Sequence, residues 1–479
     1  PSSQPSSQPS QPSSQPSCQP SSQPSTVPTN MPVPQELLDI GSYAISVGFA
    51  FAALTPAGTV VGWGKLSLED YPTAGQNSTL ANVIVAENAT EIVASRTAYA
   101  ALKQGGGLVA WGVSAAYAGA DQYATSPVTI RNLVANAAAF AGIDDSTGAV
   151  IAFGAYGNGN NVSDDAQCNG YSSQLSSGVQ SLVASAAAFA AVRDDGRVYA
   201  WGSAYTGAGV SSETNAELQN VLQVYATRTA FAAMLSSRSV VTWGGIYGGG
   251  DSSSVSGDIS GGVLHVVSTQ SVFVAFKEDT SIVAWGHSLY GGDTSSVASQ
   301  LSVGVVTIAY TSSAIAALKD DGSVVTWGNN KVGADSSAVQ AQLVNITAVY
   351  SNRFAFAALN SDGGVVAWGH ATDGGSIPAS KVSALSANVT AIFSTHRAFA
   401  ALKNDGELVL WGNAYHGGDA GPAAAPYLTS SVTAVCANDA AFTAIKVDGS
   451  AVVWGHDSSI PFAGLLMGAP SLVNVTRCA

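Results

Sequence analysis

The feature that most constrains this chain is a Trp-Gly pair that recurs at nearly constant distance along the 479 residues. Every tryptophan belongs to such a pair, and one Phe-Gly takes the same place. The pairs begin at Trp63, Trp111, Phe153, Trp201, Trp243, Trp285, Trp327, Trp368, Trp411 and Trp454, mostly 41 to 43 residues apart. A repeat of this length indicates a propeller, a solenoid or a related tandem array.

A second marker precedes each Trp-Gly: an aromatic or apolar residue within a run of small residues. Phe399, for example, lies twelve residues before Trp411, with an Asp-Gly at Asp405 between them. Asp and Gly tolerate positive φ, and the residues before the tryptophan are often β-branched, so the two markers predict a β-hairpin. An apolar run before the hairpin, such as 346–350, predicts a third strand. The segment after Trp-Gly fits either one helical turn or a fourth strand.

The sequence therefore predicts an all-β tandem array of ten units of about 42 residues, in which the tryptophans are packing residues repeated between units. A closed β-propeller, as one large ring or two smaller rings, is the first interpretation, and an open superhelical array is the alternative. The tail at 471–479 resembles the opening strand of an eleventh unit, because 472–476 is similar to 343–347. We expect it to complete the first unit of the same chain or to pair with another molecule's sheet.

The amino-terminal segment differs in composition from the array. Residues 1–34 repeat Pro-Ser-Ser-Gln and then continue Pro-rich, which predicts an extended polyproline II arm or stalk, whereas residues 35–479 form the predicted ten-repeat domain. A net charge of −14 with 17 basic residues disfavours nucleic acid and anionic membranes as partners. No apolar stretch reaches the roughly 20 residues of a membrane-spanning helix. Because the sequence starts within a repeat and without Met, we expect a processed or partial product of a secreted precursor.

Cysteines and glycosylation sequons also suit an extracellular protein. The four cysteines have no metal-binding spacing, which favours disulfides, with a Cys18–Cys478 bridge as one candidate tether. They are Cys18, Cys168, Cys436 and Cys478. The sequons fall at Asn77, Asn88, Asn161, Asn345, Asn388 and Asn474. Three of them lie eleven residues before the repeat aromatic, which either attached glycans or shared descent of the repeats would explain.

The remaining candidate residues recur with the repeat. An aspartate recurs eight or ten residues after the tryptophan, as Asp121, Asp251, Asp293, Asp335 and Asp419. Their oxygens would suit Ca²⁺, but most follow Gly and precede Ser or Thr, which favours turn capping. His287, His370 and His456 directly follow Trp-Gly, which favours a surface-loop position over a metal site. The sequence has no Gly-x-Ser-x-Gly elbow, phosphate loop or His-Glu-x-x-His, so we expect neither catalysis nor a cofactor.

The hairpin unit at 398–412, with its aromatic and small run, Asp-Gly turn, β-branched run and Trp-Gly in order, resembles the repeats of the regulator-of-chromosome-condensation family. That resemblance covers residues 35–479 and implies a β-propeller. The Pro-Ser-Ser-Gln repeats resemble those of secreted and cell-surface proteins of stramenopile algae.

Two functions of different class follow from these features. The first is an extracellular structural glycoprotein that self-assembles, through its arm and terminal strand, into a surface coat or a filament such as a flagellar hair. The second is a secreted recognition module whose rim loops bind a protein or carbohydrate ligand.

Overall fold

The computed structural model describes residues 49–54, 60–65, 79–95, 98–112, 128–155, 170–437, 439–448, 450–455, 464–466 and 477–478. The arm at 1–34 lies outside them. Ten antiparallel sheets follow one another along the chain, eight with three strands and two with four. The prediction of an all-β tandem array is confirmed.

The sheets match the predicted units one for one. The eight three-stranded sheets are β4–β6 (Ala89–Ala94, Ala98–Lys103, Leu108–Gly112), β7–β9 (Ile130–Ala135, Ala139–Asp144, Val150–Gly154), β10–β12 (Val179–Ala184, Ala188–Arg193, Val198–Gly202), β13–β15 (Val221–Ala226, Ala230–Leu235, Val240–Gly244), β16–β18 (Val263–Ser268, Val272–Lys277, Ile282–Gly286), β19–β21 (Val305–Tyr310, Ala314–Lys319, Val324–Gly328), β22–β24 (Ile346–Ser351, Ala355–Asn360, Val365–Gly369) and β25–β27 (Val389–Ser394, Ala398–Lys403, Leu408–Gly412). The first sheet has the order β3-β2-β1-β32 (Thr79–Ala86, Val60–Lys65, Phe49–Leu54, Arg477–Cys478), and the last has the order β28-β29-β30-β31 (Val432–Ala437, Ala441–Lys446, Ala451–Gly455, Gly464–Leu466).

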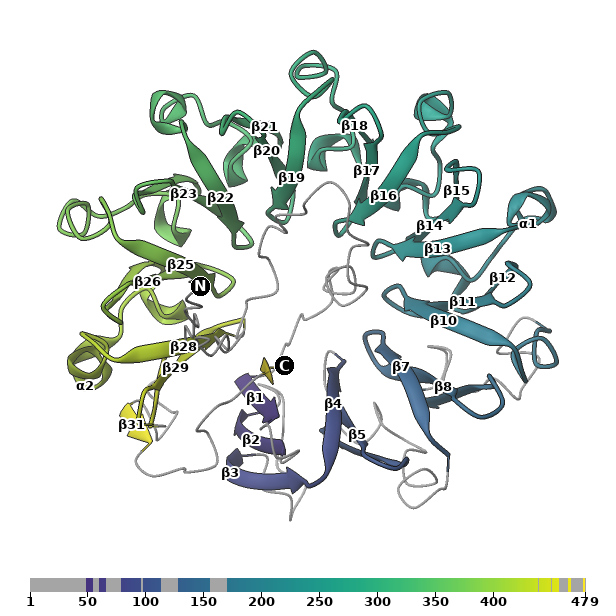
Figure 1. Ribbon diagram of the computed structural model, residues 1–479, viewed down its shortest axis with the longest axis horizontal. Coiled ribbons are helices and arrows are strands. Elements are labelled where there is room, and N and C mark those ends of the chain that lie inside the picture. Colours follow the sequence, from purple (N-terminus) through teal and green to yellow (C-terminus); the bar gives the residue numbers. More distant parts are fainter. Residues whose placement is uncertain are drawn as a thin grey trace, which may run out of the picture.

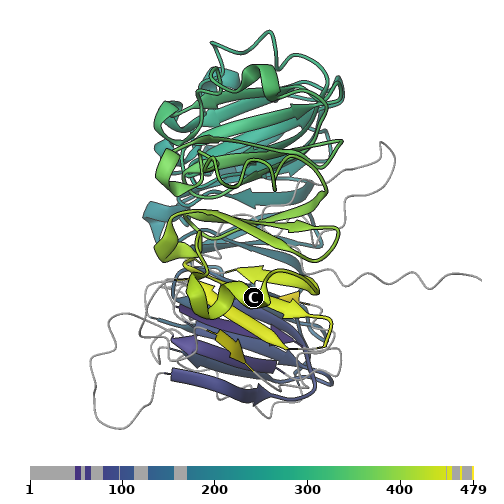
Figure 2. The same ribbon diagram turned by 90° about the vertical axis from the view of Figure 1, so that its left-hand side faces the viewer.

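The sheets are arranged as the blades of one ring (Figure 1). The first strand of each three-stranded blade runs from the outside towards the centre, so that the turn into the second strand lies at the inner edge (Figure 1). In the side view the purple first blade lies next to the yellow last blade (Figure 2). The one-ring interpretation therefore describes the chain, and the two-ring and open arrangements do not.

The carboxyl-terminal strand contributes to the first blade. β32 pairs antiparallel with β1, with Cys478 opposite Ala53 and Arg477 opposite Leu54. β32 thus takes the place that β28 holds beside β29 in the last blade. Of the two expected uses of the tail, the structure shows the first, and the strand completes a unit of its own chain.

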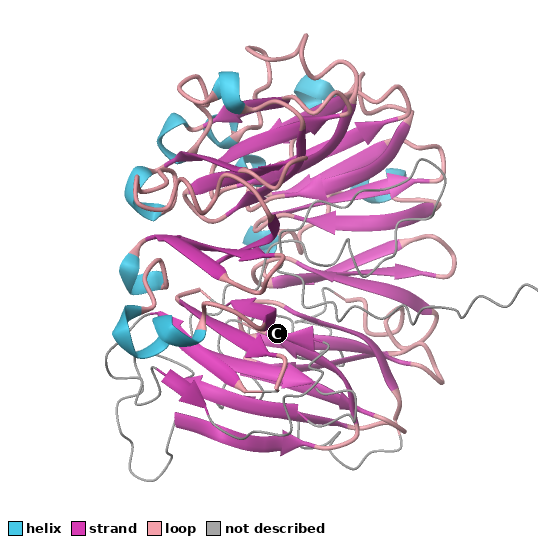
Figure 3. Cartoon of the chain, turned by 60° about the vertical axis from the view of Figure 1, so that its left-hand side comes forward, coloured by secondary structure: helices cyan, strands magenta, loops and turns pink. Residues whose placement is uncertain are grey.

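Short helices occupy the connections between blades (Figure 3). They are α1 (Ser212–Glu217), α2 (Gly421–Ala424) and the 3₁₀ turns η4 (Ala204–Thr206), η5 (Ile246–Gly248), η6 (Ser253–Val255), η7 (Ser288–Tyr290), η8 (Asn330–Val332), η9 (Gln340–Gln342), η10 (Ala371–Asp373), η11 (Ala414–His416) and η12 (Ala425–Tyr427). Between Trp-Gly and the next blade, helical turns rather than a fourth strand are the rule. Among the described residues, the outer fourth strands are β3 and β31.

The two sequence markers of each unit face each other inside the blade. Phe231 in β14 is directly opposite Trp243 in β15, and their ring centroids lie 5.4 Å apart at an interplanar angle of 23°. Both side chains are buried. The stacked pair recurs from Tyr99–Trp111 to Phe442–Trp454, except that Ile315 lies opposite Trp327. The spacing of twelve residues, thirteen for Phe140–Phe153, gives the hairpin an equivalent register each time.

Six of the indoles, from Trp243 to Trp454, also bond their blade to the preceding one. The Trp285 Nε1–H donates to the carbonyl oxygen of Gly249, at 3.1 Å, and the equivalent bond recurs from Trp243 to Trp454. Gly249 has a φ of +94°, and a Cβ there would lie 2.7 Å from the Phe273 ring. Glycine is therefore required at this position twice over, for the left-handed backbone and for the close approach of the next blade's aromatic ring.

Backbone hydrogen bonds join the blades at both edges. At the inner edge the turn residue of one blade donates to its counterpart in the next, as Arg353 N–H does to the His396 carbonyl at 3.2 Å. At the outer edge the first residue of a blade donates to the hairpin turn of the blade before, as Val305 N–H does to Thr280 at 3.1 Å. Bonds of the same kind thus recur between most neighbouring blades of the described part of the chain.

Candidate functional site

The 3₁₀ turns that directly follow Trp-Gly occupy equivalent places in successive blades, so they lie on one face of the ring. We call this face the turn face and define it by η4, η5, η7, η8, η10 and η11. A recurrent Ser, Thr or Asn side chain at the inner edge donates to the carbonyl oxygen at the end of η4, η5, η10 and η11. Thr395 Oγ1, for instance, accepts the Ala398 N–H at 3.2 Å and donates to the His416 carbonyl at 2.7 Å. The backbone of the face is therefore constant while its outward side chains vary.

Three neighbouring blades carry large apolar side chains on the turn face. We call them the aromatic arc: Tyr205, Ile246, Tyr247, Leu289 and Tyr290. Tyr205 is 90% exposed and Tyr247 79%. The His287 ring stacks on Tyr290 with centroids 4.0 Å apart and lies 5.9 Å from Tyr247, which joins two blades of the arc. A cluster of exposed aromatic side chains of this kind is typical of a macromolecular contact surface.

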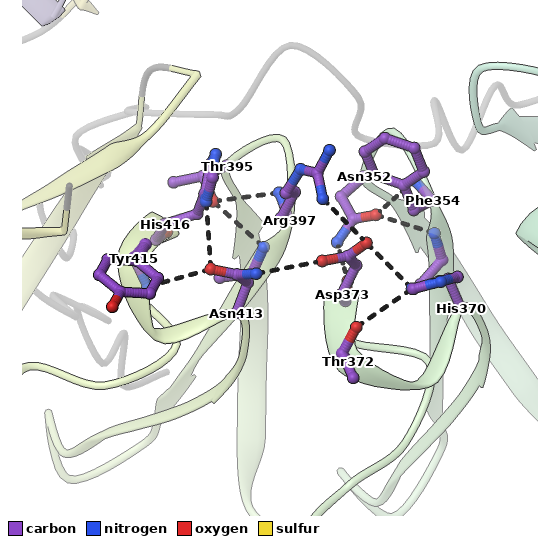
Figure 4. Close-up of polar contacts among 12 residues, drawn as sticks. Asn352, Phe354, His370, Thr372, Asp373, Thr395, Arg397, Asn413, Tyr415 and His416 are labelled. Carbon is purple, nitrogen blue, oxygen red and sulfur yellow. Dashed lines mark hydrogen bonds and ion pairs between the residues drawn. The ribbon is translucent and has the colours of Figure 1, made fainter.

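Two later blades carry a polar network on the same face, which we call the polar arc: Asn352, Phe354, His370, Asp373, Arg397 and Asn413 (Figure 4). Asp373 is its centre, and its side chain is only 2% exposed. The Asp373 carboxylate lies 3.0 Å from His370 Nδ1 and 3.4 Å from an Arg397 guanidinium nitrogen. Asn413 Nδ2 also donates to this carboxylate, at 3.4 Å. The buried carboxylate is thus surrounded by donors from two adjacent blades.

The Arg397 guanidinium is held in a defined place by Asp373 and by an aromatic ring. It lies 4.5 Å from the centroid of the Phe354 ring, and the Arg353 guanidinium lies 5.9 Å from the same centroid. Next to them, His396 Nε2 lies 3.0 Å from Asp439 Oδ1. At the inner edge Asp373 is thus paired with Arg397 and Asp439 with His396. The arrangement fixes side-chain direction across blades and presents one arginine, 41% exposed, at the surface.

The repeated aspartates act as turn residues. Asp251, Asp293 and Asp335 each accept the backbone N–H of the serine two residues later, and these bonds lower the pKa of each carboxyl group. Asp419 accepts from Gly421 N–H in the same way. Asp121 lies outside the described residues. In the part of the chain that the structure describes, no group of three or more His, Cys, Asp or Glu side chains is placed to hold a metal ion.

The repeated histidines lie where the turn face begins. His287 and His370 are the residues immediately before η7 and η10, and both belong to the surface arcs described above. His456 lies outside the described residues. His265, in contrast, lies on β16 with its ring 4.4 Å from that of Phe276, and burial lowers its pKa to about 4.

The described sequon asparagines share one backbone conformation. Asn88, Asn345 and Asn388 are exposed and have φ values of +59°, +52° and +65°. Glycine holds the same place before β10, β16 and β19, with positive φ. Asparagine is favoured there because it tolerates the left-handed region, and each side chain remains accessible at the outer edge. Asn77, Asn161 and Asn474 lie outside the described residues.

The cysteines are described only in part. Cys436, buried on β28, forms a disulfide whose partner is not among the side chains that the structure describes. Cys478 is placed by its backbone in β32, and Cys18 and Cys168 lie outside the described residues. The pairing with Cys18 stays a prediction.

No protein-family model matches this chain, and no curated protein does. Solved structures similar to it include yeast Prp20p from Saccharomyces cerevisiae (15% identity over 55% of this chain and 76% of that one, TM-score 0.30). They also include the CRINKLY WD40 ectodomain of the Arabidopsis thaliana receptor kinase ACR4 (15%, 59% and 95%, TM-score 0.29). A third is the ectodomain of the Physcomitrella patens receptor kinase CR4 (14%, 48% of this chain, TM-score 0.29), of whose length the match spans 59%. Prp20, the yeast RCC1, belongs to the family that the repeat motif resembles.

Sequence reasoning missed both arcs. The apolar residue four positions after the tryptophan recurs as Tyr205, Tyr247, Leu289 and Tyr415, and this repetition was a usable signal. The polar arc had no such signal. Asn352, Phe354, His370 and Asp373 belong to one unit, but Arg397 and Asn413 belong to the next unit and reach the Asp373 carboxylate only through the ring. Among the described residues, no helix is both long enough and apolar enough to span a membrane.

Proposed function

We propose that this protein is a non-catalytic, extracellular structural glycoprotein whose rigid ring associates with other copies of itself through the turn face. The observation that carries the proposal is the aromatic arc, in which large apolar side chains, up to 90% exposed for Tyr205, lie on the equivalent turns of three neighbouring blades. Large apolar side chains at this exposure cost solubility, and a binding surface explains their presence. The three blades that carry them are joined by the indole bonds of Trp243 and Trp285, which gives the side chains a defined spacing.

Several features support an extracellular setting. The sequons at Asn88, Asn345 and Asn388 lie on accessible outer-edge turns, and Cys436 forms a disulfide. The terminal strand completes the first blade, so assembly through that strand forms no part of the proposal. The arm at 1–34 is the remaining candidate for joining molecules into a coat or filament.

A second candidate function is recognition of a separate ligand at the polar arc. Arg397 stacked on Phe354, beside Arg353, offers cationic and aromatic groups together, a combination that suits an acidic protein or sugar acid. The ligand would bind the ring without self-association.

Sedimentation velocity of the full-length protein over a range of concentrations tests the first proposal. Self-association gives a sedimentation coefficient that rises with concentration, together with chains or sheets of rings in negative-stain images. A single species of monomer mass at every concentration, with isolated rings in the images, would contradict it.

A further inference from the structure

We propose that the aromatic arc binds the Pro-rich arm, residues 1–34, of a second copy of this chain. The inference rests on the proposed self-association and names the two surfaces that carry it. The arm at 1–34 lies outside the described residues, whereas the arc is built from the turns of three described blades. The case for their contact therefore rests on the composition and length of the arm and on the exposed side chains of the arc.

The chemistry of the two surfaces is complementary. The arm has proline at every third or fourth residue, which predicts polyproline II, and this conformation loses little entropy on binding. Proline rings in such a helix pack against exposed tyrosine rings, while tyrosine hydroxyls donate to its unpaired carbonyl oxygens. Tyr205, Tyr247 and Tyr290 supply both groups on three successive blades.

Charge and length favour the arm over another ring as the occupant. All the acidic residues behind the net charge of −14 lie in residues 35–479, so two rings repel each other, whereas the arm has no charged residue. In polyproline II, 34 residues span about 100 Å. An arm of this reach can lie along the arc of a neighbouring molecule while its own ring stays at a distance.

Arm-to-arc contacts differ from a symmetric dimer in one respect that matters for assembly. Each molecule would give one arm and receive another, so the contact is head-to-tail and continues from copy to copy unless a ring of molecules closes. This geometry yields a filament or coat from a single kind of contact.

Complementation between two full-length variants tests the proposal. The first replaces Tyr205, Tyr247 and Tyr290 by Ser and retains its arm. The second replaces the arm prolines by Gly and retains its arc. We expect each alone to be monomeric, with association weakened by about tenfold or more, and an equimolar mixture to form one-to-one dimers and no larger species. Tyr415→Ser, a 72% exposed tyrosine outside the arc, is the matched control and should associate like the unchanged protein.

The outcomes separate this inference from the proposed function. If the unchanged protein does not associate, the proposed function fails and the inference with it. If it associates and the triple tyrosine variant associates equally, only the inference fails. If the proline variant alters the sedimentation coefficient of the monomer without any dependence on concentration, the arm binds its own ring and the inference is overturned. Circular dichroism and an unchanged melting temperature show that each variant retains the fold.

Discussion

The aromatic arc and the polar arc are built on the same backbone and differ almost entirely in the side chains that point outward. In both, a tryptophan donates to a glycine of the preceding blade, at 3.1 Å for Trp285 and 2.9 Å for Trp411. Beside these equal ties, Tyr247 stands 79% exposed in one arc while Asp373 is buried among donors in the other. The comparison teaches that the buried ties determine the ring, whereas the outward positions of the same turns are free to carry different chemistry.

The largest effect should come from the glycine under the next blade's aromatic ring. Gly249→Ala places a Cβ 2.7 Å from Phe273 at a φ of +94°, and Gly374→Ala places one 2.6 Å from Phe399 at +105°. We expect each to lower the free energy of unfolding by about 3 to 4 kcal/mol, from backbone strain and overpacking together. Urea denaturation measures it, with Gly257→Ala as the control, because a Cβ there meets nothing within 4 Å. Clearly unequal losses of free energy of unfolding in the two variants would show that the two arcs do not rest on equivalent contacts.

Low pH should destabilise the blades of the aromatic arc more than those of the polar arc, because His265 belongs to a blade of the aromatic arc. Burial lowers the pKa of His265 to about 4, from 6.5, so the unfolded chain binds the proton more readily. Above pH 6.5 His265 is neutral in both states and does not lower the free energy of unfolding. As the pH falls from 6.5 towards 4, protonation of the unfolded chain lowers that free energy by about 2 to 3 kcal/mol.

His265→Thr, which copies Thr307 at the equivalent place of β19, should remove this part of the acid sensitivity. Hydrogen exchange at pH 5 should show β16–β18 opening before β25–β27 in the unchanged protein and not in the variant. Equal protection of both blades in the unchanged protein would contradict the assignment.

The indole ties offer a smaller and sharper test. Trp285→Phe and Trp411→Phe copy the natural Phe153, keep a stacked ring and remove the N–H that bonds to glycine. Each variant should lose about 2 kcal/mol, because a buried carbonyl oxygen loses its donor and some packing volume is lost. Thermal or urea unfolding of the pair measures this, and a near-zero loss in both would show that stacking alone holds the blades.

The smallest effects should come from single side chains of the turn face. Asp373→Asn removes the charge that holds His370 and Arg397, and we expect a loss of about 1 kcal/mol because Arg397 is partly exposed. A double-mutant cycle with Arg397→Gln isolates the pair, and purely additive losses would mean that the two side chains are not coupled. Exposed Tyr247→Ser in the other arc should change stability by no more than about 0.5 kcal/mol.

Much of the fold could be predicted because its signals are local. The twelve-residue interval between Phe399 and Trp411, with an Asp-Gly turn inside it, indicates a hairpin in which these two residues lie opposite each other, as the structure shows. The glycine after η5 could not be assigned its role in the same way, since its partners Phe273 and Trp285 belong to the next unit. The network around Asp373 was hidden for a related reason: Arg397 and Asn413 belong to the next unit and approach the Asp373 carboxylate only when neighbouring blades stand side by side.

The positions of the asparagines teach a further point about repeats. Asn88, Asn345 and Asn388 were singled out as sequons, yet Gly178, Gly262 and Gly304 hold the same place with positive φ. The recurrence of asparagine at this place is therefore explained by the backbone conformation, without any need for an attached glycan. Whether glycans are attached there remains a prediction that peptide mapping by mass spectrometry would test.

Single-particle electron microscopy of the purified protein, viewed along the ring axis, tests whether ten blades close into one ring. One ring with ten lobes around a single centre, with the first and last lobes in contact, is the result that we predict. Two smaller rings, a ring of seven lobes or an open arc with a gap between the first and last lobes would contradict the account.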